Sequence, residues 1–279
     1  MNAASDPRLT CRLDGRAARS LEGLAPADAY LDPAPHVVTV GRASLRARPD
    51  PAAEQETELL FGERFDVLLT EGPWAFGQGL RDGYVGWVEA AALRPEAAAP
   101  NCWVRALRSV ALAAPSPRAP PVAFLALNAL VTVETEEAGF SRLAGGGWVP
   151  SGHLAPVGLG FEADPAAVAE RHLGAPYLWG GRTTAGVDCS GLVQQALFAC
   201  GRACPRDSDL QASLGRPVGV EALRRGDLVC WPGHIGLMAD AERLVHASGV
   251  QMAVVAEPLA AAVAARLADA GPPTGFRRL

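Results

Sequence analysis

A glycine-rich stretch from Pro176 to Val193 contains the residues best suited to catalysis, among them Cys189. Beyond this cysteine, apolar residues recur at helical spacing from Leu192 to Cys200, which predicts a helix that begins at about Cys189. Unpaired backbone N–H groups and the positive end of the helix dipole stabilise a thiolate in a first turn. We therefore expect the pKa of Cys189 to lie below its usual value of about 8.5. A thiolate is the nucleophile that cysteine catalysis requires.

The alternative for any free cysteine is burial as a small hydrophobic residue, which is its commoner fate. Cys200 fits that interpretation, because it continues the apolar stripe of the predicted helix. Cys189 does not fit, because it precedes the stripe and its neighbours are aspartate, serine and glycine. We therefore interpret Cys189 as a nucleophile.

A nucleophile of this kind needs a base, and two histidines twelve residues apart, His234 and His246, lie on short stretches with strand-like alternation. On the first stretch, Ile235 and Leu237 face the side opposite His234. If the two strands are neighbours, His246 holds the ring of His234 in the required tautomer, as the third group of a nucleophile–base–orienter site does. The other histidines lie elsewhere in the chain: His36, His153 and His172.

A zinc site is the competing interpretation of the same region, since Cys200, Cys204, Cys230 and His234 supply soft ligands. The 25 residues between the second and third ligands, and the position of Cys200 on a helix face, disfavour it. Such a site also uses His234 as a ligand. The sequence therefore predicts no metal and no cofactor.

The elements that position these residues form an α+β arrangement, in which helices precede a sheet. A helix is predicted over Asp164–Leu173, with Asp164 as N-cap and Pro165 in the first turn. His172 lies near its end, where a positive charge suits the helix dipole. Strands are predicted around 227–230, 235–239 and 243–246, and the alanine-rich segment 260–270 is read as a helix of unknown role.

Two segments of about 60 residues precede this region and look like copies of one another. One ends in Gly86-Trp87-Val88 with Leu93 five residues on, and the other in Gly147-Trp148-Val149 with Leu154 at the same spacing. Short alternating runs split by Gly, Pro and Asp predict small all-β modules. The clearest strands are 37–40, 65–69 and 130–133. The predicted domains are an arm over 1–35, β modules over 36–96 and 101–157, and a catalytic domain over 161–279.

The composition excludes several classes of protein. Nearly half of the 279 residues are apolar, so the chain can bury ordinary cores, and the net charge of −5 argues against a nucleic-acid partner. The apolar stretches are broken by charge or proline, so no membrane span is predicted. The first residues lack the features of a secretory signal, and six irregularly spaced cysteines suit a reducing compartment. These features predict a cytoplasmic protein; a signal upstream of Met1 makes it an exported one.

The chain resembles the NlpC/P60 peptidases of bacterial cell walls in two motifs, Asp188-Cys189-Ser190-Gly191 at a helix start and Gly233-His234-Ile235-Gly236. The repeated Gly-Trp-Val resembles bacterial SH3 domains. The resemblance implies two SH3-like barrels before a papain-like catalytic domain, with Cys189, His234 and His246 as the catalytic set. It also implies that Tyr177 borders the oxyanion site and that Trp179 lines the cleft.

Members that pair two bacterial SH3 domains with this catalytic domain cleave between γ-D-glutamate and the diamino acid of stem peptides whose L-alanine amine is free. Their Asp-Ser pair binds that amine, which implies Asp207 and Ser208 here. A buried ammonium needs such a carboxylate. A tyrosine of the first SH3 module walls the site, which implies Tyr84, and an acidic residue of that module contributes, Glu56 or Glu58. The predicted substrate-binding set is Asp207, Ser208, Trp179, Asp188, Ser190 and Tyr84.

These expectations lead to a cysteine peptidase that acts on muropeptide fragments in cell-wall recycling. Three other functions stay open: an exported hydrolase of intact peptidoglycan, a non-catalytic muropeptide-binding protein, and an acyltransferase on the same fold. The diamino acid, the oligomeric state and the role of residues 1–35 are not determined by the sequence.

Overall fold

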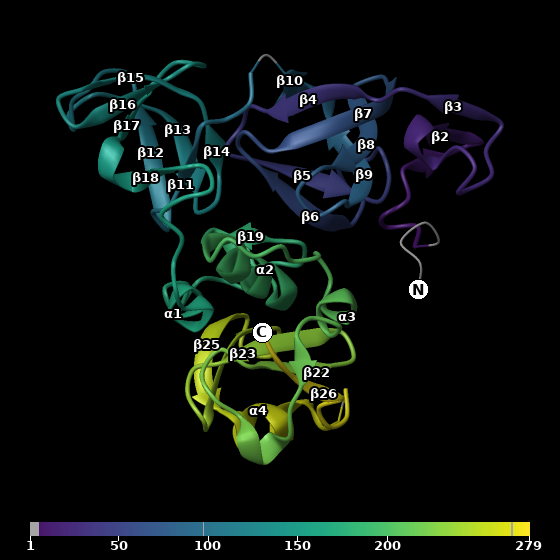
Figure 1. Cartoon of the computed structure of the whole chain (residues 1–279), viewed down its shortest axis with the longest axis vertical. Coiled ribbons are helices and arrows are strands. Elements are labelled where there is room, and N and C mark those ends of the chain that lie inside the picture. Colours follow the sequence, from purple (N-terminus) through teal and green to yellow (C-terminus); the bar gives the residue numbers. More distant parts are fainter. Residues whose placement is uncertain (1–5, 97, 269) are drawn as a thin grey trace. The chain divides into compact units, whose positions relative to one another are not determined.

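The computed structural model describes residues 6–96, 98–268 and 270–279, and the chain divides into two compact units that meet at Val157 and Gly158. Both units consist mostly of sheet (Figure 1). Buried apolar residues form separate clusters in the first unit and a further cluster in the second. Within the described residues, no helix combines the length and the apolar character that a membrane crossing needs.

The first unit opens with a small three-stranded sheet formed by the segment predicted as an arm. Its order is β1-β2-β3, with β1 at Arg12–Leu13, β2 at Arg16–Ala18 and β3 at Ala29–Leu31. Tyr30 closes the loop before β3 because its hydroxyl donates to the carbonyl of Ala25 at 2.8 Å. The N-terminal segment thus has secondary structure of its own.

A seven-stranded antiparallel sheet follows, in the order β10-β4-β7-β8-β9-β5-β6. Its strands are β4 (Ala34–Val38), β5 (Arg42–Arg46), β6 (Gln55–Leu60), β7 (Arg64–Glu71), β8 (Trp74–Gly79), β9 (Val85–Glu89) and β10 (Leu93–Pro95). The inward residues Leu45, Phe65 and Val88 are fully buried, as alternation along twisted strands requires. The predicted strand 65–69 lies inside β7, whereas the predicted strand 37–40 ends at Val38.

The second β segment forms two sheets, in the orders β14-β11-β18 and β13-β12-β17-β16-β15. Its strands are β11 (Cys102–Val104), β12 (Arg108–Leu112), β13 (Pro121–Ala126), β14 (Leu130–Val131), β15 (Val133–Glu137), β16 (Phe140–Leu143), β17 (Trp148–Pro150) and β18 (Leu154–Pro156). The single strand predicted over 130–133 is wrong. The chain leaves one sheet after Val131 and enters the other at Val133.

The two Gly-Trp-Val copies occupy equivalent places in the two β segments. In each, the strand that carries the tryptophan is followed by one turn of 3₁₀ helix, Ala90–Ala92 or Ser151–His153. The leucine five residues after the valine then begins the last strand, β10 or β18. The sequence repeat therefore corresponds to a repeat of local structure.

The second unit is built on a six-stranded antiparallel sheet in the order β21-β26-β22-β23-β24-β25. Its strands are β21 (Arg216–Pro217), β22 (Leu228–Trp231), β23 (His234–Met238), β24 (Arg243–Ser248), β25 (Ala253–Pro258) and β26 (Gly275–Arg278). A short hairpin, β19 (Arg182–Thr183) with β20 (Gly186–Val187), precedes the main helix. The helices are α1 (Pro165–Glu170), α2 (Cys189–Ala199), α3 (Ser208–Gln211) and α4 (Leu259–Arg266).

Helices α2 and α4 lie on opposite sides of this sheet (Figure 1). Helix α2 begins at Cys189, as predicted, and its apolar residues Leu192, Val193 and Leu197 are fully buried. Helix α4 packs Ala262 against Leu244 and Met238. The predicted alanine-rich helix extends past the end of α4 and includes residue 269, which lies outside the described residues.

Helix α1 begins as predicted, because the Asp164 side chain accepts from the N–H of Ala166 at 2.9 Å. It ends three residues earlier than predicted, at Glu170. Gly174 has a φ of +81° and donates its N–H to the carbonyl of Val254, which turns the chain toward β25. The predicted cationic role of His172 is wrong. Burial lowers its pKa to about 4, so the neutral ring donates from Nδ1 to the carbonyl of Val168.

The buried His172 predicts a pH-dependent stability for the second unit. Its pKa of about 4 in the folded state lies below the ordinary value of 6.5, so between these values the unfolded chain binds the additional proton. Stability is therefore lost as the pH falls from 6.5 to 4. One such group contributes a slope of up to about 1.4 kcal/mol per pH unit.

The measurement is urea unfolding at several pH values, followed by hydrogen exchange of peptides from α1 and α2. His172→Gln keeps a donor for Val168 but does not titrate, so its stability falls less steeply below pH 6.5. Parallel curves for the two proteins contradict the assignment.

Candidate active site

Cys189 lies in the first turn of α2, directly after its N-cap Asp188. One oxygen of this carboxylate, Oδ1, accepts from the N–H of Gly191 at 2.6 Å. The other, Oδ2, accepts from the N–H of Gly180 at 2.8 Å. The two bonds hold the start of α2 against the glycine-rich loop, and this fixes where the backbone presents Cys189.

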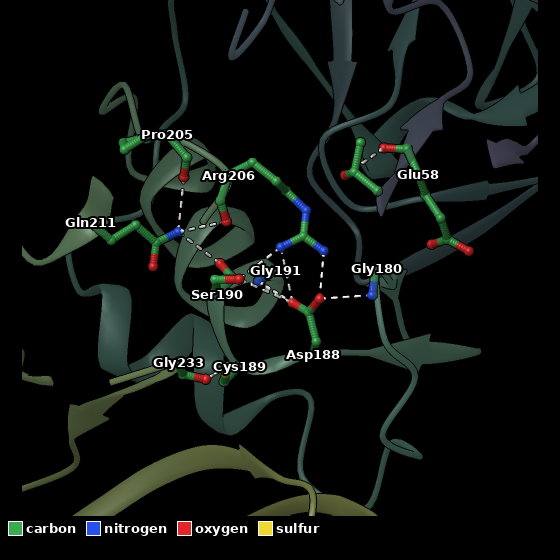
Figure 2. Close-up of polar contacts among 11 residues, drawn as sticks. Glu58, Gly180, Asp188, Cys189, Ser190, Gly191, Pro205, Arg206, Gln211 and Gly233 are labelled. Carbon is green, nitrogen blue, oxygen red and sulfur yellow. Dashed lines mark hydrogen bonds and ion pairs between the residues drawn. The ribbon is translucent and has the colours of Figure 1, made fainter. Parts of the chain in front are cut away.

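Arg206 completes the coordination of Asp188 in a buried bidentate ion pair (Figure 2). One guanidinium nitrogen lies 2.6 Å from Oδ2 of Asp188, and the other lies 3.0 Å from Oδ1 and 2.8 Å from the Ser190 hydroxyl. The Arg206 side chain is 1% exposed and that of Asp188 is 8% exposed. Both charges are shielded from water, so burial of either one alone would be strongly unfavourable.

Gln211 joins the same network from α3 (Figure 2). Its amide nitrogen donates to the carbonyls of Ser190 at 2.9 Å and of Pro205 at 2.8 Å. Residues 205–211 are therefore fastened to the start of α2 at both ends, through Arg206 and through Gln211. Neither residue was assigned a role from the sequence. The only sequence feature that could have indicated their roles was the charge of Arg206, in a segment that the fold buries.

Glycine at position 191 permits this close packing. A Cβ atom there would lie 2.3 Å from the carbonyl oxygen of Gly181 and 2.9 Å from Oδ1 of Asp188. Any side chain would therefore push the helix away from the loop and break the Asp188 contacts. The Asp-Cys-Ser-Gly motif therefore ends in glycine because no side chain fits at position 191.

The expectation of a lowered pKa for Cys189 is wrong for this structure. Burial, with the nearby charge of Asp188, raises the pKa of the thiol to about 11, against opposing effects of the Ile235 and Ser190 N–H groups and of Arg206. The helix N-terminus is present, but desolvation of the thiolate outweighs it. The resting state is therefore a neutral thiol. Its Sγ lies 4.0 Å from the carbonyl oxygen of Gly233, the residue before His234.

The two histidines lie on adjacent antiparallel strands, β23 and β24, so the condition set by the sequence analysis is met. Nε2 of His234 lies 2.8 Å from Nδ1 of His246, and both rings are almost fully buried. Gly236, opposite His246 on β23, leaves room for the His246 side chain, since a Cβ there would lie 3.0 Å from the Cβ of His246. With Nε2 of His234 in contact with His246, the other ring nitrogen of His234 is Nδ1.

Glu257 on β25, a residue with no role predicted from the sequence, extends this pair to a row of three side chains. Its Oε1 lies 2.8 Å from Nε2 of His246. Glu257 is paired in register with Leu244, two residues before His246, so it reaches the histidine along the diagonal between neighbouring strands. The alternation of residues along β25 could have indicated this contact only if the pairing of β25 with β24 had been known.

Both imidazoles are neutral at neutral pH. Burial, followed by the charges of Arg266 and His246, lowers the pKa of His234 far below its usual value. Burial also lowers the pKa of His246, against an opposing effect of Glu257. A neutral thiol and a neutral imidazole are the resting forms that a general-base mechanism uses, in which the proton moves as the sulfur attacks.

The remaining predicted residues of the second unit lie as follows. Burial and the nearby Cys189 and Asp188 raise the pKa of Tyr177, so its phenol stays a neutral donor. Trp179 is half exposed, and Asp207 and Ser208 are partly buried at the start of α3. Asp188 and Ser190 are engaged with Arg206, which gives both a positioning role. Their predicted contact with substrate stays a prediction.

Tyr84 and the two acidic candidates belong to the first unit. Tyr84 is buried in the core of the seven-stranded sheet, between β8 and β9. Glu56 and Glu58 lie on β6, where Glu58 pairs with Arg42. Their predicted contributions to the site stay predictions. Among residues 6–96, 98–268 and 270–279, no three His, Cys, Asp or Glu side chains are grouped as a metal site would require.

The ion pair of Asp188 and Arg206 predicts a large effect of a single substitution. Arg206→Met leaves a carboxylate buried without its cation, which costs about 3–5 kcal/mol of unfolding free energy. Chemical denaturation of the full chain measures this loss, and the exposed Arg243→Met is the matched control, for which we expect less than about 1 kcal/mol. Equal stabilities of the two variants contradict the assigned role of Arg206.

Family comparison gives two separate matches. Residues 45–93 match the family described as the bacterial dipeptidyl-peptidase Sh3 domain, and residues 174–267 match the NlpC/P60 family. The second match includes Cys189, His234, His246 and Glu257, and the first lies within the seven-stranded sheet.

Among curated relatives, the γ-D-glutamyl-L-lysine dipeptidyl-peptidase of Bacillus subtilis (strain 168) is 26% identical over 211 residues, 68% of this chain and 71% of the relative. A probable endopeptidase of Mycobacterium tuberculosis (strain ATCC 25618 / H37Rv) is 38% identical over 104 residues, 34% of this chain and 27% of the relative. Dipeptidyl-peptidase 6 of Lysinibacillus sphaericus is 32% identical over 89 residues, 32% of this chain and 33% of the relative. Both latter matches span a third or less of the relative's length.

The fold is shared with a solved structure of an NlpC/P60 family protein from Bacillus cereus ATCC 10987. The TM-score is 0.75 at 19% identity, and the alignment covers 88% of this chain and 99% of that chain. The chain therefore carries a cysteine peptidase domain of the NlpC/P60 family joined to a bacterial SH3 domain.

Proposed function

We propose that this chain hydrolyses the bond between γ-D-glutamate and the diamino acid of peptidoglycan stem peptides whose N-terminal L-alanine is free. The observation that carries the proposal is that Sγ of Cys189 approaches Gly233, the residue before His234, while the His234 ring contacts His246, all within an NlpC/P60 domain. The bond is suggested by the relative named as a γ-D-glutamyl-L-lysine dipeptidyl-peptidase, which matches this chain across both of its units.

The reaction begins with attack of the Cys189 sulfur on the γ-glutamyl carbonyl while Nδ1 of His234 accepts the thiol proton. The tetrahedral oxyanion accepts hydrogen bonds from the backbone N–H of Cys189, which has no intrahelical acceptor in the first turn of α2, and from the neutral phenol of Tyr177. The protonated His234 then gives its proton to the leaving amine of the diamino acid. The thioester that remains is hydrolysed when His234 takes a proton from water.

The free amine of the substrate is bound by Asp207 and Ser208 in this proposal. These residues follow Arg206, whose ion pair with Asp188 ties them to the start of the nucleophile helix. A carboxylate beside an ammonium forms a charge-assisted hydrogen bond that an acylated amine cannot form. The site therefore selects fragments that have lost the sugar from L-alanine, and Trp179 supplies an aromatic wall of the cleft.

The finer domain organisation belongs to the same proposal. The two β segments, 36–96 and 101–157, are two SH3 domains, because their final strands and 3₁₀ turns repeat. The domain from 161 to 279 has a papain-like α+β fold, with α2 and the β21–β26 sheet as its two parts. Tyr84 and either Glu56 or Glu58 stay the predicted contributions of the first SH3 domain to substrate binding. A substrate of free-amine fragments suits cell-wall recycling in the cytoplasm.

The first test is mass spectrometry of L-Ala-γ-D-Glu-diaminopimelate after incubation with the protein. We expect release of L-Ala-D-Glu from the free peptide, no release from an N-acetylated copy, and no reaction with Cys189→Ala. Cleavage of both peptides at equal rates contradicts the amine-selective site and favours a hydrolase of intact wall. Absence of cleavage of either peptide contradicts the proposed reaction.

The amine-binding role of Asp207 has its own prediction. Asp207→Asn removes the charge beside the ammonium, so we expect kcat/KM on the free peptide to fall about 10- to 100-fold, as for loss of a charge-assisted hydrogen bond. Asp209→Asn changes an exposed carboxylate two residues away and is the matched control, with kcat/KM unchanged. If both variants keep the selectivity of the unsubstituted protein for the free peptide, Asp207 does not bind the amine.

A further inference from the structure

Glu257 is placed to decide which nitrogen of each catalytic histidine carries a proton. Its Oε1 lies 2.8 Å from Nε2 of His246, whose Nδ1 lies 2.8 Å from Nε2 of His234. The His246 ring is 2% exposed and the Glu257 side chain 20% exposed, so the contact is largely shielded from water. Three neighbouring strands, β23, β24 and β25, each supply one member of the row.

The hydrogen-bonding rules of the side chains leave one arrangement of protons. A carboxylate only accepts, so Nε2 of His246 carries a hydrogen and donates it to Glu257. A neutral imidazole has one donor and one acceptor, so Nδ1 of His246 is an acceptor. Nε2 of His234 must then carry a hydrogen, and its Nδ1 is left bare. That bare nitrogen is the one a base needs toward Cys189.

We propose that Glu257 is a positioning residue of the peptidase, which sets the tautomers of His246 and, through it, of His234. The inference deepens the proposed function and rests on its assignment of His234 as the base. Without the carboxylate, His246 is free to carry its hydrogen on Nδ1 and donate it to Nε2 of His234. The hydrogen of His234 then moves to Nδ1, which can no longer accept the thiol proton.

Glu257 also influences whether the two histidines can carry a positive charge. Arg266 on α4 disfavours a positive charge on both histidines, and His246 disfavours one on His234. The carboxylate of Glu257 has the opposite effect, because it favours a positive charge on His246. When His234 takes the thiol proton, Glu257 therefore stabilises the resulting imidazolium through His246, as the acid of a serine-protease triad does for its histidine.

The direct test is NMR of the full chain labelled with ¹⁵N-histidine, which distinguishes the two tautomers of each ring. His234→Asn and His246→Asn assign the two signals. We expect hydrogen on Nε2 of both rings in the unsubstituted protein and on Nδ1 of both rings in a substantial fraction of Glu257→Ala. Hydrogen on Nδ1 of His246 in the unsubstituted protein, or unchanged tautomers in Glu257→Ala, overturns the inference.

The functional test compares three variants on the free peptide. Glu257→Ala lowers kcat about 100-fold, the lower end of a general-base contribution, with KM almost unchanged. Glu257→Gln lowers kcat less, because its amide oxygen can accept from Nε2 of His246 and so keep the tautomer of that ring. Glu242→Gln, an exposed glutamate at the turn between β23 and β24, leaves kcat unchanged. Equal kcat in all three variants overturns the inference.

A substrate-independent measurement separates this inference from the proposed function. Iodoacetamide labelling of Cys189, read by peptide mass spectrometry, slows in Glu257→Ala, while labelling of the free cysteines Cys102 and Cys200 does not change and reports an intact fold. If Cys189→Ala still cleaves the peptide, the proposed function fails, and the NMR result alone decides the role of Glu257. Labelling of Cys189 at an unchanged rate overturns the effect of Glu257 on the base.

Discussion

The buried carboxylate of Asp188 joins three chain segments that build the nucleophile's side of the site. It accepts from the glycine-rich loop at Gly180, from the helix start at Gly191 and from Arg206 of the segment that follows α2. Without Arg206, the Asp188 carboxylate would be buried with its charge uncompensated. The ion pair therefore holds the three segments together in addition to packing. The position of Cys189 follows from it.

The base side of the site depends on a different support, the register of three antiparallel strands. Pairing of β23 with β24 and of β24 with β25 places His234, His246 and Glu257 on one face in a row. The backbone hydrogen bonds of these two strand pairs set the register, and the register sets where the three side chains lie. The two supports meet where Sγ of Cys189 approaches Gly233 at the start of β23.

Burial decides the electrostatic character of the site. It raises the pKa of Cys189 and lowers the pKa values of His234 and His246, so each reacting group rests in its neutral form. In the proposed mechanism, a thiolate–imidazolium pair is therefore a state reached only during the reaction. A neutral thiol is also a weaker target for oxidants than a thiolate.

The sequence by itself determined what depends on local spacing. It predicted the start of α2 at Cys189, the N-cap at Asp164, the strands that carry His234 and His246, and the repeated Gly-Trp-Val segments. Helical and strand periods are local properties, which is why these elements were predictable. Tertiary structure alone decided the partner of Asp188, the contact of Glu257 with His246, the break of the predicted strand at Thr132 and the raised pKa of Cys189. These features depend on which distant residues pack together and exclude water, and that information is not contained in the spacing of neighbours along the chain.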